Sequence, residues 1–138
     1  GTPNAIALGG TSTPPGTMTP VGPYSHISKA GPLITISATA GVDPATGELA
    51  GPDVASQTRQ ILDGFEIMLE SVGAGMDNIM HVTVFLTDMA DFAEMNAAYA
   101  EKMGELRPAR SAVSDTGVPK PGALLTMNLI AVVGDEAR

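Results

Sequence analysis

Cysteine and tryptophan are both missing from this chain of 138 residues. Without a thiol there is no disulfide, no thiolate ligand for a metal and no cysteine nucleophile. Aromatic residues make up only 4% of the sequence, whereas hydrophobic residues make up 43%. The core is therefore expected to consist mainly of alanine, valine, isoleucine, leucine and methionine, in a single domain over residues 1–138 whose first 20 residues form a flexible segment.

Long hydrophobic runs are also missing. The uninterrupted apolar stretches are far shorter than the roughly 20 residues that cross a bilayer, and the sequence does not open on a basic region followed by an apolar one. We therefore expect no membrane partner and no signal peptide. The absence of cysteine is compatible with a reducing compartment, so a cytoplasmic location is the expectation.

Positive charge is scarce, with 7 basic against 15 acidic residues and a net charge of −8. A protein that binds nucleic acid concentrates lysine and arginine on one face, whereas the basic residues here are scattered. The two histidines, His26 and His81, are far apart and have no carboxylate at metal-ligand spacing. We expect a small-molecule partner, no nucleic acid, no metal and no other cofactor.

Two segments have the period of a helix. In the first, one face is apolar and the other carries polar residues that include Gln57; Asp53 is a suitable N-cap and Gly73 a suitable end. In the second, Asp91 and Glu94 have the spacing of a capping box. The predicted helices cover residues 54–72 and 91–103.

Stretches rich in β-branched residues, bounded by turn-forming residues, predict the strands. They cover residues 24–30, 33–37, 79–86, 109–114 and 124–133, with a weaker strand-like stretch at 5–8. The order β-β-α-β-α-β-β predicts an α+β fold with two helices on one face of the sheet. Because the last strand is apolar on both faces, the face without helices needs a partner, and self-association is the simplest one.

Six short motifs occur in a characteristic order along the chain, over about residues 20–134. Together they resemble the Rid/YjgF family, the reactive intermediate deaminases that are also called endoribonuclease L-PSP-like proteins. The motifs are Gly22-Pro23-Tyr24-Ser25, residues 43–48, Gln57-Thr58-Arg59-Gln60, residues 83–92, Arg107-Pro108-Ala109-Arg110-Ser111 and Leu129-Ile130-Ala131-Val132.

The resemblance implies a chorismate-mutase-like fold and a homotrimer with the sheets inside, the helices outside and pockets between subunits. It also implies hydrolysis of reactive enamines and imines, such as 2-aminoacrylate, to keto acids and ammonia. By the same resemblance, Arg110 holds the substrate carboxylate beside the backbone of Ala112. The other residues that it places at the pocket are Tyr24, Ser37, Ala38 and Asn96.

Arg110 lies among small and apolar residues in a predicted strand. A guanidinium holds a carboxylate through two parallel charge-assisted hydrogen bonds and stays charged at any working pH. The alternatives are a solvent-facing side chain or a salt bridge across the trimer. Arg107 is expected to be a surface residue at the end of the second helix.

Asn128 departs from the pattern of the deaminating family members, which carry a glutamate at this position. An amide can hold water, but it is neither a general base nor a general acid near neutral pH. Ala112 replaces the usual cysteine of the family. His26 stands near Tyr24 and titrates in the useful range, although a structural histidine is the simpler interpretation. His81 is expected at the surface of a strand.

Three hypotheses follow. The first is a hydrolase in which Arg110 anchors the carboxylate, Tyr24 and Asn96 shape the pocket, and Asn128 holds water; we group Tyr24 and Asn128 as the candidate catalytic residues. The second is a trimer that binds or senses a small carboxylate without catalysis, which the loss of the glutamate favours. The third is an endoribonuclease or translation inhibitor, which the charge of −8 disfavours.

Overall fold

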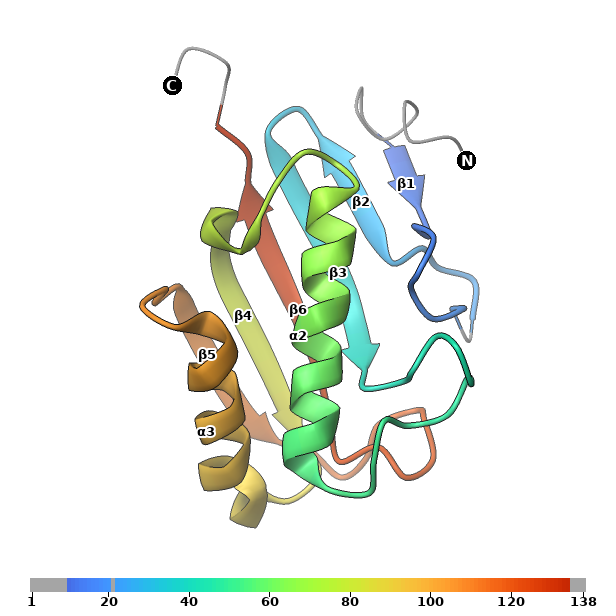
Figure 1. Cartoon of the computed structure of the whole chain (residues 1–138), viewed down its shortest axis with the longest axis vertical. Coiled ribbons are helices and arrows are strands. Elements are labelled where there is room, and N and C mark those ends of the chain that lie inside the picture. The colour runs from blue at the N-terminus through green and yellow to red at the C-terminus, as the bar shows by residue number, and fades with distance from the viewer. Residues whose placement is uncertain (1–9, 21, 135–138) are drawn as a thin grey trace.

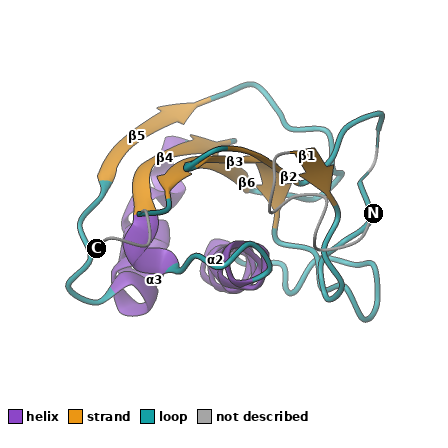
Figure 2. Cartoon of the chain, turned by 90° about the horizontal axis from the view of Figure 1, so that it is seen from above, coloured by secondary structure: helices purple, strands orange, loops and turns teal. Residues whose placement is uncertain are grey.

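The computed structural model describes residues 10–20 and 22–134. One sheet has the strand order β1-β2-β3-β6-β4-β5, and both helices lie on the same face of it (Figures 1 and 2). Only β4 and β5 pair in parallel, so the sheet is mixed and the predicted α+β fold is confirmed. The elements are β1 Gly10–Ser12, β2 Ile27–Ala30, β3 Leu33–Ala40, α2 Val54–Glu70, η1 Met76–Asn78, β4 Ile79–Leu86, η2 Met89–Asp91, α3 Phe92–Met103, β5 Ala109–Ser114 and β6 Leu125–Val132.

The predicted strand order lacked β1. Its residues Gly10–Ser12 have little intrinsic preference for strands and are held by antiparallel pairing with β2. Residues 24–26 are irregular, so β2 is shorter than predicted, whereas β3 continues to Ala40 through an irregularity in its pairing with β6. The strand-like stretch at residues 5–8 lies outside the described residues.

Helix α2 lies along the middle of the sheet and supplies much of the core (Figure 1). Asp53 caps its N-terminus as predicted, because the carboxylate accepts a hydrogen bond from the Ser56 backbone N–H. The hydrogen bonds from the backbone and side chain of Ser56 hold the pKa of Asp53 below its ordinary value. Fully buried Phe65 and Leu69 project from the same face of the helix.

Gln57 was expected on the polar side of α2, and this prediction is wrong: its side chain is completely buried. Its amide nitrogen donates to the Gly51 and Gly122 carbonyls, and its amide oxygen accepts from Leu124 N at 2.8 Å. A buried amide is stable when its donors and acceptors are satisfied. Gln57 thereby fixes the loop that precedes β6 to the start of α2.

Gly41 lets α2 approach the end of β3 closely. A Cβ atom at this position would lie 2.5 Å from the Gln57 carbonyl oxygen and 2.7 Å from the Gln57 Cα. Both atoms belong to the backbone, so the helix itself would have to shift. The packing of α2 on the sheet therefore requires glycine at position 41.

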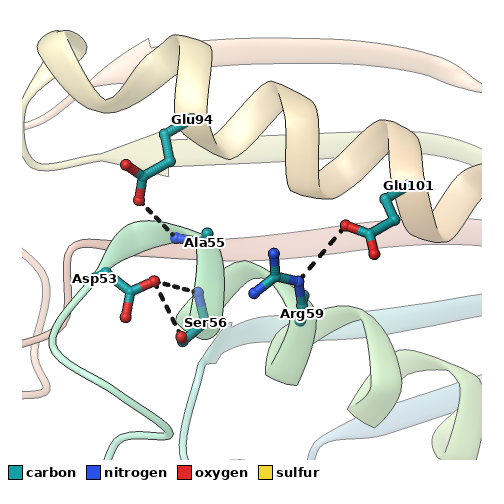
Figure 3. A network of polar contacts seen from close by, with 6 residues as sticks. All are labelled: Asp53, Ala55, Ser56, Arg59, Glu94 and Glu101. Carbon is teal, nitrogen blue, oxygen red and sulfur yellow. Dashed lines mark hydrogen bonds and ion pairs between the residues drawn. The ribbon is translucent and has the colours of Figure 1, made fainter.

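Helix α3 is joined to α2 by polar side chains (Figure 3). The predicted capping box is wrong, since Asp91 makes no side-chain cap and Glu94 instead accepts a hydrogen bond from Ala55 N at 3.2 Å. Arg59 and Glu101 form an exposed ion pair at 3.7 Å. Lys102 contacts carboxylates of α2, and its hydrogen bond with Glu66 raises the pKa of the lysine.

The face of the sheet opposite the helices carries exposed apolar side chains. Figure 2 shows that neither helix covers this face. Leu33 and Val132 lie opposite each other on β3 and β6 and are 46% and 39% exposed, and Ile130 is 44% exposed. Thr126 and Asn128 continue the same face of β6, so that strand is apolar outward only toward its C-terminal end.

Among the described residues, no helix is long and apolar enough to cross a membrane.

Candidate functional site: two hollows on one chain

Arg110 lies on edge strand β5, with its side chain directed toward helix α3. It pairs with Val82, a core residue, so it belongs to the helix-facing side of the sheet. The guanidinium carbon lies 4.7 Å from the centre of the Tyr99 ring and 5.6 Å from that of Phe92. These distances are typical of a cation held over aromatic faces, so α3 supplies a platform for the guanidinium.

A hollow of about 460 Å³ opens beside this platform. We call it the arginine hollow. It brings together Arg110 and Asn96, two of the residues that the resemblance assigns to the pocket. No aspartate or glutamate contributes to its wall, which is formed by Asn96, Tyr99, Ala100, Leu106, Arg107, Pro108 and Arg110.

Tyr99 forms the buried floor of this region and is 8% exposed. Burial raises the pKa of its phenol, while the positive charges of Arg110 and Arg107 oppose that shift. Within the described part of the chain, the hydroxyl group has no hydrogen-bond partner. The ring is thus a support for the guanidinium, and Tyr99 is a residue that the sequence analysis did not select.

Arg107 is exposed and lies after the end of α3, as predicted. Its Nη1 donates to the carbonyl oxygens of Gly104 and Leu106, the latter at 2.9 Å. These two contacts hold the side chain against the end of the helix. The same side chain also contributes to the wall of the arginine hollow, which the sequence analysis did not anticipate.

A second hollow, of about 210 Å³, lies at the central strands β3 and β6 and at loops beside them. We call it the tyrosine hollow. It brings together Tyr24, Ser37 and Ala38, three of the predicted pocket residues. No sequence motif indicated the rest of its wall, which is formed by Met18 of the N-terminal loop, Ala40 at the end of β3, Pro119 and Lys120 of the loop before β6, and Thr126 of β6.

His26 holds one wall of the tyrosine hollow in place. Its ring is 1% exposed and meets the Tyr24 ring edge to face, with the centroids 6.2 Å apart. Nε2 is hydrogen-bonded to the Met18 carbonyl oxygen, and the His26 carbonyl accepts from Ser37 N at 2.9 Å. Because His26 is not part of the wall of either hollow, the geometry supports the structural interpretation of this residue.

Asn128 and Ala112 lie in neither wall. Asn128 is half-buried on β6 and pairs with Thr83 of β4, on the face without helices. Ala112 is half-buried on β5 opposite Val84. The predicted site residues are therefore divided among the two hollows and the strands between them, and one copy of the chain does not gather them into one pocket.

His81 lies half-buried in a strand, with Nε2 3.3 Å from the Ser111 hydroxyl oxygen. Within residues 10–20 and 22–134, no carboxylate forms an ion pair with His81. In the same part of the chain, no three histidine, cysteine, aspartate or glutamate side chains lie close enough to hold a metal ion.

Comparison with known proteins places this chain in a family. A family profile described as endoribonuclease L-PSP matches residues 16–133. A RutC family protein of Pyrococcus horikoshii is 46% identical over 101 residues, which are 73% of this chain and 80% of that protein. One from Pyrococcus abyssi is 40% identical over 112 residues, covering 81% of this chain and 87% of that protein. The chain therefore belongs to the Rid/YjgF family, to which the L-PSP description applies.

Solved structures agree with this family. The Escherichia coli YjgF gene product superposes with a TM-score of 0.83 at 35% identity and covers 89% of this chain and 98% of its own. Escherichia coli TdcF, solved with bound serine, has a TM-score of 0.85 at 30% identity, covering 91% of this chain and 99% of its own. RidA from an Antarctic Psychrobacter has a TM-score of 0.85 at 30% identity, covering 90% and 99%. The expected chorismate-mutase-like fold is confirmed.

Proposed function

We propose that this protein is a deaminase-like hydrolase that adds water to a carboxylate-bearing enamine or imine of the 2-aminoacrylate type and releases a 2-keto acid and ammonia. The observation that carries the proposal is Arg110, whose guanidinium lies over Tyr99 at the wall of a hollow without acidic residues. Such a cation is suited to a carboxylate ligand. The bound serine in the TdcF structure, also a small molecule with a carboxylate, supports this ligand class.

The complete pocket, in this proposal, lies between two copies of the chain in a homotrimer. Each copy has the arginine hollow near the β5 edge of its sheet and the tyrosine hollow at the central strands β3 and β6. The exposed apolar face at Leu33, Ile130 and Val132 is suited to burial against another copy. Assembly would bring the arginine hollow of one copy against the tyrosine hollow of the next.

The proposed roles divide by hollow. Arg110 holds the carboxylate, with the backbone of Ala112 beside it. Asn96 forms part of the wall of the same hollow and shapes it. From the neighbouring copy, Tyr24 shapes the pocket with the Ser37–Ala38 segment. Positioning and electrostatics provide the acceleration, because protonation of the enamine at carbon gives an imine that water attacks readily.

Whether this protein catalyses the reaction depends most on what Asn128 can do. Its amide can hold a water molecule, but it cannot accept the proton of that water as a carboxylate would. Neither hollow has an aspartate or glutamate in its wall. This observation favours a second candidate function, a trimer that binds or senses a small carboxylate without turning it over.

An endoribonuclease is the weaker candidate, although the family profile carries that description. A net charge of −8 opposes binding of a polyanion. RNA cleavage by the wild-type protein that disappears in Arg110→Ala would restore this candidate.

The test is deamination of freshly generated 2-aminoacrylate, followed as loss of the product that semicarbazide traps from the imine. We expect the wild-type protein to suppress trapping and Arg110→Ala to have no effect, with Arg59→Ala as the matched control. Activity confined to Asn128→Glu would show an intact pocket whose natural chemistry differs. Inactivity of all variants, together with binding of 2-ketobutyrate to the wild type, would support the non-catalytic candidate.

The assembly is tested separately by sedimentation. We expect a trimer at micromolar concentration, and Ile130→Lys should dissociate it because a charge would be buried in an apolar contact. A wild-type monomer at that concentration would contradict a pocket shared between copies.

A further inference from the structure

Two guanidinium groups share the arginine hollow without an acidic neighbour. In a chain with 15 acidic and 7 basic residues, two other cations form ion pairs: Arg59 with Glu101, and Lys102 with two carboxylates of α2. Arg107 and Arg110 have no carboxylate within ion-pair distance in the part of the chain that the structure describes. The hollow is a local concentration of positive charge on an acidic protein.

The Arg107 side chain is held in place, yet it has donors to spare. Its two hydrogen bonds are both donated by Nη1, to the carbonyl oxygens of Gly104 and Leu106. A guanidinium has five N–H donors in a planar fork, and Nη2 and Nε donate to no described residue. An arginine fixed in this way loses little further freedom when it binds an anion.

Both charges act on the same region. The fields of Arg110 and Arg107 both reach the Tyr99 phenol, and both side chains line the hollow. Arg110 is additionally stacked on that ring. A ligand whose carboxylate is held by Arg110 therefore extends into the field of a second, pre-positioned cation.

We propose that the substrate carries two carboxylates, one bound by Arg110 and the other by Arg107. This inference rests on the proposed function and narrows its substrate class: enamines or imines that derive from acidic amino acids would be preferred to those from neutral ones. A monocarboxylate would leave Arg107 facing solvent. A dicarboxylate would add a charge-assisted contact to Arg107 at little cost in side-chain conformational entropy.

The experiment compares 2-oxoglutarate with 2-oxovalerate, two acids of equal chain length that differ in the terminal carboxylate. Their dissociation constants are measured by isothermal titration calorimetry at low salt. We expect the wild-type protein to bind 2-oxoglutarate about tenfold more tightly. Arg107→Gln should bring 2-oxoglutarate to the affinity of 2-oxovalerate, whereas Arg107→Lys should keep part of the preference because it keeps the charge.

Two further variants separate this inference from the proposed function. Arg110→Gln should lose both acids, and Arg59→Gln, which alters an exposed ion pair outside the hollow, should match the wild type. Equal affinity of the wild type for both acids, or a preference that survives in Arg107→Gln, would overturn the dicarboxylate inference while the loss in Arg110→Gln still supports the carboxylate anchor. Binding of both acids that is indifferent to Arg110→Gln would overturn both proposals.

Discussion

The two helices cover the same face of the sheet but contribute differently to the molecule. Helix α2 meets β3 so closely that Gly41 leaves no room for a Cβ atom, and its buried amide Gln57 ties the loop before β6 into the core. Helix α3 lies over the β5 edge, where Tyr99 supports the Arg110 guanidinium beside an open hollow. The tightly packed helix fixes the fold, whereas the helix at the edge borders an open hollow with two arginines in its wall.

We therefore expect stability and ligand binding to depend on different helices. Changes at the α2 contact should lower the free energy of unfolding, while changes around α3 should alter binding in a protein that still folds.

The largest effect is expected at Gly41. Gly41→Ala forces Cβ against the Gln57 backbone, and we expect a loss of about 3 kcal/mol in the free energy of unfolding, since the helix must shift. Gly64→Ala in α2 is the matched control: its Cβ would meet only the end of the Met68 side chain, at 3.9 Å. That variant should gain about 0.5–1 kcal/mol. Urea unfolding of both variants checks the pair, and equal stability of the two would refute the close contact.

Arg110→Ala should give the largest effect on binding. Loss of a bidentate, charge-assisted contact is expected to weaken a small 2-keto acid by about 100-fold, with little change in thermal unfolding. Calorimetric titration beside Arg59→Ala measures this effect. If Arg110→Ala binds as the wild type does, the arginine hollow is not the anchor.

Two substitutions at Tyr99 distinguish the role of the ring from that of its hydroxyl group. Tyr99→Phe keeps the platform under Arg110 and removes a buried hydroxyl that lacks a partner in the described chain, so binding should be retained and stability should not fall. Tyr99→Leu removes the aromatic face, and affinity should drop about fivefold. An equal loss in both variants would mean that the hydroxyl, rather than the ring, serves the ligand.

The smallest effect concerns the pH dependence of the α2 cap. Hydrogen bonds from Ser56 hold the pKa of Asp53 below 3.8 in the folded protein. The stabilisation by the charged form is therefore complete above that unfolded value and is lost as pH falls through the lower, folded one. Asp53→Asn keeps an acceptor without a titrating charge. The difference in melting temperature between wild type and variant should shrink with acidification in this range; a constant difference would argue against the ionised cap.

Much of the fold was predictable because local patterns determined it. Strands β4 and β5 have the predicted bounds, since β-branched and alternating residues define them. Gln57 was misplaced because polarity alone does not reveal a satisfied buried amide. Short strand β1 was missed because pairing with β2, rather than its own residues, makes it a strand.

The site was predictable only in part. Family motifs selected Arg110 and Asn96, which the structure brings to one hollow, and Tyr24, which it brings to the other. The resemblance implied pockets between subunits, but the motifs did not show which residues each copy contributes to which hollow. Arg107 was recognised as a surface residue at a helix end, but its place in the wall depends on how α3 meets β5.

Mixed assemblies test the shared pocket most directly. Arg110→Ala and a variant in the other hollow, Tyr24→Ala, are each expected to bind 2-ketobutyrate poorly alone. After co-refolding at equal amounts, about one quarter of the sites should combine an intact arginine hollow with an intact tyrosine hollow from the neighbouring copy. Titration should then show tight binding at about one quarter of the wild-type stoichiometry. If the mixture gains no tight sites while each variant still assembles, the two hollows do not form one pocket.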